Sequence, residues 1–73
     1  MRVFDLKQGE TGVITKIELS GGARERLYSL GIREGEKIEV ISFSLLKSSV
    51  LISCAAVRVG IRKSIARKIE VKP

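Results

Sequence analysis

The sequence predicts a mainly β protein, a small and strongly bent antiparallel barrel of about five strands with one short α-helix. Three observations indicate this fold class. Apolar and polar residues alternate over several short segments, which is the pattern of half-buried strands. Helical spacing of apolar residues is confined to about residues 22–30. The 73 residues suffice for a single domain spanning 1–73, and closing the sheet would remove exposed strand edges.

The one predicted helix is short and ends at a glycine. Ala23, Leu27 and Leu30 lie at i, i+4 and i+7, so they share one face. Gly31 follows at the position where helices commonly end in a left-handed residue, and Ile32 can fold back onto the last turn. Two turns of helix are not stable alone in water, so we expect the apolar face to pack against the sheet.

Five strands are expected, over residues 12–19, 37–46, 50–54, 57–62 and 69–71. In the first, Val13, Thr15 and Ile17 alternate with polar residues and are expected to face inward, while Ile14 breaks the pattern. In the second, the phase of the alternation shifts, which predicts a β-bulge or bend near Ile41.

Two connections complete the predicted fold. Residues 54–56 must hold the hairpin turn between the third and fourth strands, although no Gly, Asn or Asp is present to ease it. A helical turn is expected near residues 63–67, with Ile65 and Ala66 inward, because the strand alternation stops there.

Positive charge is concentrated at the C-terminal end. The formal net charge is +6, and residues 58–73 carry six basic side chains and one acidic one, a net of +5. The remaining 57 residues carry eight basic and seven acidic side chains, a net of +1. This segment suits an acidic partner, such as nucleic acid, an anionic membrane surface or an acidic protein face. A solvated strand face that keeps a small protein in solution is the alternative interpretation.

The numbers of cysteine and histidine residues limit the possible disulfides and metal sites and indicate the cellular compartment. The chain has one cysteine and no histidine, so it lacks an internal disulfide framework and the usual zinc spacings. A reducing, cytoplasmic location is expected. The N-terminal residues show no apolar run of the signal-peptide type, and the longest uncharged stretch, residues 48–57, is ten residues, about half of a membrane span.

The residues do not favour an enzyme or a metal site. Catalysis needs an activated nucleophile or two titrating groups tuned apart, and the closest acids, Glu34 and Glu36, are typical of a solvated turn. Cys54 lies in an apolar strand and is expected to be a core residue. Ferrous iron favours imidazole together with carboxylate, and no imidazole is present, so we expect no metal site and no cofactor; weak carboxylate binding is left open.

Three motifs follow one another along nearly the whole chain. They are Asp5-Leu6-x-x-Gly9-Glu10-x-Gly12-Val13-Ile14-x-x-Ile17, Arg26-Leu27-x-x-Leu30-Gly31-Ile32-x-x-Gly35-x-x-Ile38-x-Val40, and Val57-x-Val59-x-Ile61-Arg62-x-x-x-Ala66-x-x-Ile69-x-Val71. In this order and spacing they resemble the FeoA family of ferrous-iron transport accessory proteins. Two departures stand out: Ala55 and Ala56 occupy a hairpin turn where members often have glycine, and the loop 43–49 lacks a proline that such loops often carry.

The resemblance implies a small cytosolic SH3-like β-barrel that works beside FeoB, a membrane ferrous-iron transporter with a cytosolic GTP-binding domain. Iron is then the cargo of that partner. The same domain also occurs behind the DNA-binding part of metal-dependent repressors. Because the chain shows no DNA-binding domain, the transport role is the better expectation: a non-enzymatic accessory protein that docks on the transporter and modulates iron uptake or GTP turnover.

The expected partner-binding residues are Arg24, Tyr28, Phe43, Leu45, Leu46, Arg58, Arg62 and Lys63. The first two lie on the outer face of the helix, and Tyr and Arg are favoured at the centres of interfaces. The loop residues are apolar side chains that so small a barrel does not readily bury. The basic residues are expected to strengthen docking onto an acidic face or to bring the protein toward an anionic membrane surface.

Two alternatives stay open from the sequence. The runner-up function is binding of RNA or single-stranded nucleic acid, although residues 58–73 contain no aromatic side chain on which bases could stack. The exposed apolar loop also leaves a homodimer open.

Overall fold

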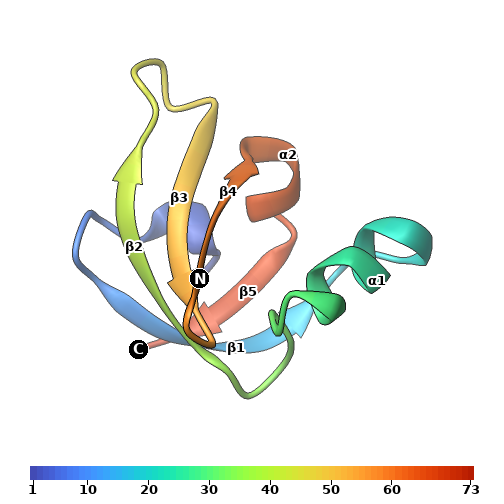
Figure 1. Cartoon of the computed structure of the whole chain (residues 1–73). Helices are drawn as coiled ribbons and strands as arrows, with labels where there is room; N and C mark the ends of the chain where they lie inside the picture. Colours follow the sequence, from blue (N-terminus) through green and yellow to red (C-terminus); the bar gives the residue numbers. More distant parts are fainter.

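The computed structural model describes residues 1–73 and arranges five strands in one antiparallel sheet (Figure 1). The strands are β1 (Thr11–Ile17), β2 (Lys37–Phe43), β3 (Ser49–Cys54), β4 (Val57–Arg62) and β5 (Ile69–Lys72). The helices are α1 (Gly21–Ser29), α2 (Lys63–Ala66) and a short 3₁₀ turn, η1 (Val3–Asp5). The predicted helix and helical turn are thus confirmed, whereas η1 was not predicted. None of the helices is both long and apolar enough to span a bilayer.

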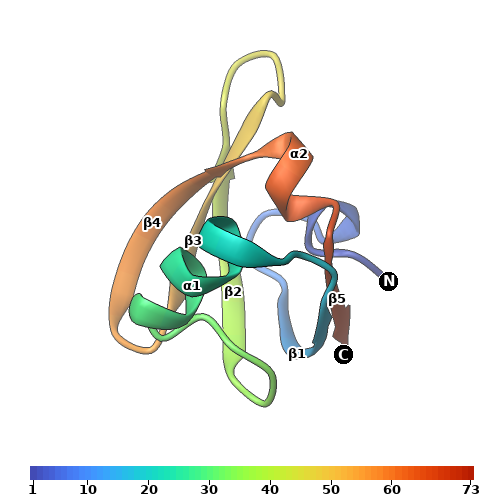
Figure 2. The same ribbon diagram turned by 90° about the vertical axis from the view of Figure 1, so that its right-hand side faces the viewer.

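The strand order is β4-β3-β2-β1-β5, so the first strand pairs with both the second and the last. This is the order of an SH3-like sheet, and the mainly β prediction is confirmed. The expected closure of the barrel is wrong, because β4 and β5 lie at opposite ends of the order and do not pair. The residues between them form α2 instead of continuing a ladder, and α1 lies beside the opening next to β4 (Figure 2).

Two β-bulges bend the sheet. The predicted bulge near Ile41 is confirmed, because the register of β2 on β3 shifts between Val40 and Ser42. A second bulge, which was not predicted, shifts the register of β1 on β5 between Ile14 and Lys16.

The second bulge corrects the expected inward face of β1. Ile14 and Ile17, three positions apart, are both buried, while Thr15 is exposed and Val13 is only partly buried. The extra residue at the bulge reverses the alternation between the two isoleucines. Ile14, which breaks the simple alternation, is therefore a core residue.

One cluster of fifteen buried apolar residues forms the core, and it draws on every helix and strand. The sheet contributes most of it, and η1 adds the fully buried Val3. In α2, Ala66 is fully buried and Ile65 half-buried, as expected. The remaining side chains are available for the surface features described below.

Helix α1 ends as the sequence predicts. Gly31 has a φ of +86°, in the left-handed region. Its N–H donates to the Tyr28 carbonyl at 3.0 Å, and the Ile32 N–H donates to the Leu27 carbonyl at 2.9 Å, the paired bonds of a Schellman cap. A Cβ at Gly31 would lie 3.0 Å from the Ala55 Cβ of the β3–β4 hairpin turn. Gly31 therefore serves both the cap and the close packing of the helix end on the sheet.

We expect Gly31→Ala to lower the free energy of unfolding by about 1–3 kcal/mol, because the new Cβ is strained at this φ and crowds Ala55. Urea denaturation followed by circular dichroism measures the change. Gly22→Ala is the matched control: Gly22 lies within α1 and nothing stands within 4 Å of an added Cβ, so stability should rise by up to about 1 kcal/mol. Equal effects of the two changes would contradict the steric role of Gly31.

The β3–β4 hairpin has a two-residue turn made of Ala55 and Ala56, between the paired residues Cys54 and Val57. The φ values are +51° for Ala55 and +66° for Ala56, so both alanines occupy the left-handed region. That conformation costs an L-residue roughly 1–2 kcal/mol, and glycine or asparagine is its usual occupant. The turn lies where the sequence predicts it, and it carries backbone strain.

Relief of this strain should stabilise the fold. We expect Ala56→Gly to raise the free energy of unfolding by roughly 0.5–1 kcal/mol, because glycine adopts the left-handed conformation freely and the exposed Ala56 side chain contributes nothing to the core. An upward shift of the urea midpoint, with an unchanged slope, is the expected measurement. A lower midpoint would show that the turn is not strained at this residue.

Candidate functional site

The β2–β3 hairpin projects beyond the rest of the sheet (Figure 1). At its tip, residues 44–48, Leu45 is 98% exposed and Leu46 is 86% exposed. The Ser44 hydroxyl accepts hydrogen bonds from the N–H groups of Ser48 at 3.0 Å and Ser49 at 3.1 Å. These bonds close the turn and end β2 at Phe43, three residues before the predicted end of the strand. These hydrogen bonds therefore fix the backbone of the hairpin tip, while its two leucine side chains face solvent.

An aromatic pair lies at the base of the hairpin tip. Phe43, the last residue of β2, packs edge-on against Phe4 of η1, with ring centroids 5.3 Å apart and planes at 76°. The Lys47 ammonium lies 5.4 Å from the centre of the Phe43 ring, and the Lys63 ammonium lies 5.2 Å from that of Phe4. The sequence did not identify Phe4 as a surface residue, and its only signal was an aromatic side chain among the apolar and charged residues of the N-terminal segment. The result is an apolar surface bordered by two lysines.

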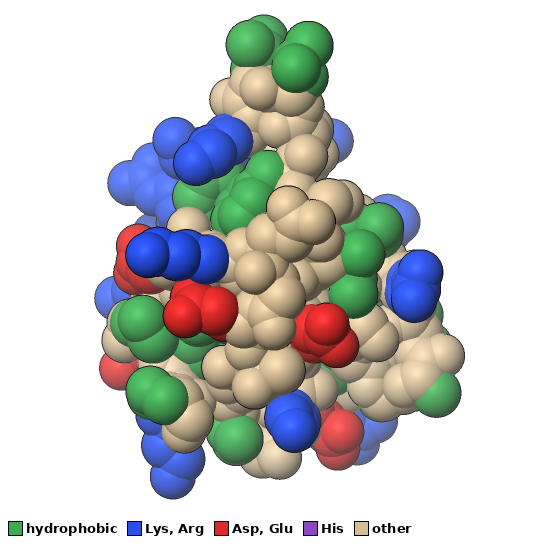
Figure 3. All heavy atoms as spheres, turned by 90° about the vertical axis from the view of Figure 1, so that its left-hand side faces the viewer, with side chains coloured by type: hydrophobic (Ala, Val, Ile, Leu, Met, Phe, Trp, Pro, Cys, Tyr) green, Lys and Arg blue, Asp and Glu red, His purple; other side chains and the backbone are tan.

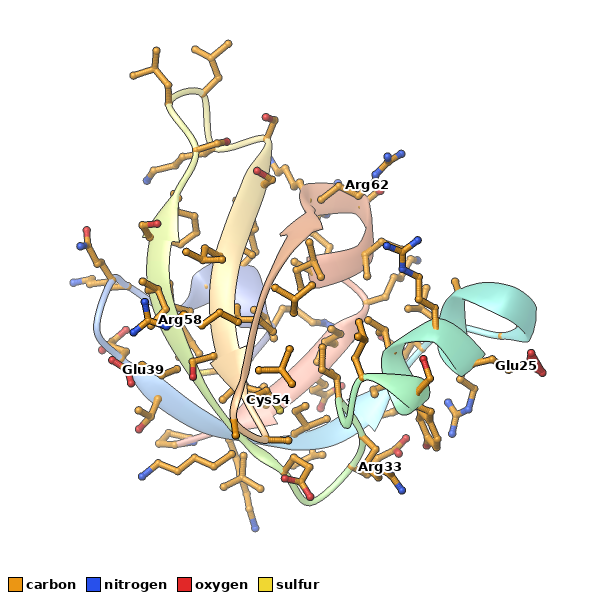
Figure 4. The ribbon with its side chains drawn as sticks, viewed as in Figure 1. Glu25, Arg33, Glu39, Cys54, Arg58 and Arg62 are labelled. Atoms are coloured by element: carbon orange, nitrogen blue, oxygen red, sulfur yellow. The ribbon has the colours of Figure 1, made fainter.

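The basic residues 58–63 divide between two places. Arg62 stands opposite Ser49 in the β3–β4 register, and the Lys63 N–H donates to the Ser48 carbonyl at 2.8 Å, so both lie against the hairpin tip. Arg58 stands opposite Ser53, further along β4, and Figure 4 shows it well apart from Arg62. The space-filling view shows basic side chains just below the apolar end of the molecule (Figure 3). Only part of the basic segment therefore adjoins the tip.

Arg24 and Tyr28 do not join the hairpin tip. They lie on α1, where the Arg24 guanidinium donates to the Tyr28 hydroxyl at 2.7 Å and to Glu34 at 3.3 Å. It also donates to the Ile17 carbonyl at 2.9 Å, and the Tyr28 hydroxyl in turn donates to Glu34. We call Arg24, Tyr28 and Glu34 the tyrosine cluster. Their bonds link α1 to the end of β1 and to the turn before β2, so they brace the fold.

The tyrosine cluster shifts two pKa values in opposite directions. The hydrogen bond to the Glu34 carboxylate stabilises the protonated hydroxyl and raises the pKa of Tyr28, burial raises it further, and Arg24 opposes the shift. The same hydrogen bond lowers the pKa of Glu34, because it stabilises the charged carboxylate. Tyr28 is therefore neutral and Glu34 charged at neutral pH.

An absorbance titration tests this cluster directly, because the chain has one tyrosine and no tryptophan. We expect the 295 nm signal to rise with a midpoint above the ordinary value of about 10. Glu34→Gln should move the midpoint back toward that value, since the charge and its strong acceptor are lost. Because the folded-state pKa is raised, the stabilisation by this bond should be present at neutral pH and decline as the pH rises past about 10.

Circular dichroism at each pH is the control that the chain is still folded during the titration. A midpoint at or below the ordinary tyrosine value, or one that Glu34→Gln leaves unchanged, would show that the hydroxyl does not donate to Glu34 in solution.

The acidic and sulfur side chains are dispersed. No group of three or more His, Cys, Asp or Glu residues is placed to hold a metal ion. Cys54 is 2% exposed, and its sulfur lies 3.9 Å from the Gly31 carbonyl oxygen. Burial, with a smaller contribution from the Glu36 charge, raises the pKa of the Cys54 thiol. Cys54 is thus a protonated core residue, as the sequence predicts.

Comparison with known proteins gives consistent results. The family model named FeoA domain matches residues 1–73. A Porphyromonas gingivalis protein, named as an Fe(2+) transport protein A/Fe(2+) transporter FeoB fusion protein, is 32% identical over 72 residues. That match covers 99% of this chain and 8% of the fusion protein.

Two further similarities span most of both chains. A Methanocaldococcus jannaschii protein, provisionally named as an Fe(2+) transport protein A, is 36% identical over 66 residues, which are 90% of this chain and 78% of the relative. The solution structure of the FeoA protein from Chlorobium tepidum superposes with a TM-score of 0.93 at 28% identity, and the match covers 99% of this chain and 69% of that chain.

Proposed function

Because the chain belongs to the FeoA family, we propose that it is a non-enzymatic accessory domain of ferrous-iron transport. In this proposal the domain docks on the cytosolic part of a FeoB-type transporter and modulates its iron uptake or GTP turnover. The fused relative supports the pairing, since a covalent connection keeps two modules at high effective concentration. Iron is assigned to the transporter as cargo, in keeping with the absence of histidine from this sequence.

The observation that carries the proposal is the pair of solvated leucines on a projecting, well-closed hairpin tip. Complete burial of a leucine contributes about 1.5–3 kcal/mol, so two leucines can supply much of the energy of a specific but reversible contact. Phe43 extends the apolar area, and Lys47, Arg62 and Lys63 border it, which suits an acidic rim on the partner. Arg58 and the tyrosine cluster lie outside this surface and contribute only if the contact is wider.

A binding titration tests this proposal. The ligand is the isolated cytosolic domain of the FeoB-type transporter from the same organism, titrated by calorimetry. We expect Leu45→Ser with Leu46→Ser to weaken binding at least tenfold, while the free energy of unfolding changes little because both side chains are solvated. Binding should also weaken between low and physiological salt, because three basic side chains adjoin the contact.

Tyr28→Phe is the matched control, since it removes one hydroxyl and leaves the hairpin tip intact. Unchanged affinity in this control, with loss in the double serine variant, would assign docking to the tip; the reverse pattern would assign it to the outer face of α1. Full affinity of the double serine variant would refute the tip as the docking surface. Sedimentation of the free protein shows whether the leucines instead join two copies of the chain.

Single-stranded RNA is the control ligand for the runner-up function. The two phenylalanine rings pack on each other edge-on, and a lysine ammonium lies over each, so they do not form an open stacking platform. We therefore expect no saturable RNA binding. Binding to RNA with a steep salt dependence, and none to the transporter domain, would replace the docking proposal with nucleic-acid recognition.

A further inference from the structure

We propose that the groove between the free edge of β4 and helix α1 binds an extended, acidic segment of a partner protein as an added β-strand. This goes beyond the proposed function, because the apolar side chains of the groove differ from those of the hairpin tip and Arg62 alone adjoins both. The proposal also depends on the open sheet, because β4 has a free edge only where the sheet does not close.

The outer edge of β4 is open. β4 pairs with β3 on one side and has no strand on the other, so its outward backbone N–H and C=O groups are unpaired within the sheet. Gly60, in the middle of β4, is exposed, and an added Cβ there would meet nothing within 4 Å. The other end of the sheet differs: beside β5, the Val71 N–H donates to the Met1 carbonyl at 2.7 Å, and Arg2 bridges to Glu70. The N-terminal residues thus partly cover the β5 edge, whereas no strand covers the outer edge of β4.

An apolar groove with a volume of about 330 Å³ lies beside that edge. It is lined by Ala23, Arg26, Leu27, Leu30, Val59, Gly60, Ile61, Arg62 and Ile65. Leu30, Val59 and Ile65 are only half-buried and form its open walls. Successive side chains of an added strand point to opposite faces, so every second one would enter the groove. α1 lies beside β4 on this side of the molecule, as Figure 2 shows.

The charged side chains that line the groove are all basic. Arg26 of α1 and Arg62 of β4 both line the groove, both are exposed, and neither guanidinium makes an ion pair or hydrogen bond in the structure. No acidic side chain lines the groove. An added strand with apolar residues at alternate positions and Asp or Glu between them or at its ends would satisfy both arginines.

Charge also argues against a second copy of the chain as the occupant. Two β4 edges paired with each other would bring Arg58 and Arg62 of both copies together, in a protein of formal net charge +6. Charged residues on an edge strand do protect against such pairing, but this protection does not account for the apolar groove beside the edge. A partner of opposite charge accounts for both features.

The test is an NMR titration of the ¹⁵N-labelled full chain with capped nine-residue peptides in which Val or Leu alternates with Glu. We expect saturable shifts confined to β4 and α1. N-methylation of alternate peptide residues separates strand addition from simple apolar docking. Methylation along one edge of the peptide should abolish binding, and methylation along the other edge should leave affinity within twofold, because a strand bonds to β4 through one edge only.

Charge-reversal variants supply the second measurement. Arg26→Glu and Arg62→Glu should each weaken peptide binding at least fivefold. Arg67→Glu, the same charge change at an exposed position outside the groove, should alter it less than twofold. The double serine variant of the hairpin tip should keep full peptide affinity, so failure of this proposal is distinguishable from failure of tip docking.

Several results would overturn the proposal. These are the absence of saturable binding by any alternating peptide at millimolar concentration, equal binding of a peptide with the same composition in scrambled order, and indifference to methylation on either edge. Shifts at residues 44–48 in place of β4 would assign the peptide to the hairpin tip. A concentration-dependent dimer joined through β4 would assign the groove to a second copy.

Discussion

The bending of one small sheet by two β-bulges is the constraint on which the rest of the structure depends. The bulge in β2 lies between Val40 and Ser42, and the bulge in β1 lies between Ile14 and Lys16. Each inserts one residue, reverses the side-chain alternation and increases the local twist. The sheet can therefore curve around a single core while its end strands, β4 and β5, remain unpaired. The same bend carries the end of the β2–β3 hairpin beyond the core.

Both candidate binding surfaces consist of parts of the chain that the bent sheet does not bury in its core. Fifteen buried apolar residues satisfy the core, and the two leucines of the hairpin tip lie beyond its reach. The groove beside β4 exists because α1 fills the opening of the sheet only in part, and the Gly31 cap fixes where the helix ends against the β3–β4 turn. A domain of this size has little interior to spare, so both surfaces that we propose for recognition are protruding or unpaired elements.

Some charged side chains are paired within the fold and others are not. Arg24 and Glu34 neutralise each other around Tyr28, and Arg2 pairs with Glu18 and Glu70. The cations near the hairpin tip and the groove include Arg26 and Arg62, which have no acidic partner in the chain. A surplus of unpaired cations at apolar surfaces favours acidic partners and rapid association, and it disfavours self-pairing. This distribution fits the docking that we propose for this member of the FeoA family.

The sequence by itself determined the features that depend on residues close together in the chain. Helical spacing and Gly31 define α1, the phase shift near Ile41 marks the bulge in β2, and the strained turn at Ala55 was located without the structure. The sequence also predicts partner-binding residues, at positions 24, 28, 43, 45, 46, 58, 62 and 63. Alternation and charge counts do not show which of them share a surface.

Only the tertiary structure decided what depends on pairing between distant segments. The bulge in β1 lies between Ile14 and Lys16, beyond the pairing with β2 that ends at Val13, and it depends on the register with the distant strand β5. Phe4 meets Phe43 across 39 positions of sequence, and Arg62 joins the hairpin tip while Arg58 does not. Whether β4 and β5 pair depends on the summed bend of the whole sheet. For that reason the open edge, and the groove beside it, could be found only in the folded chain.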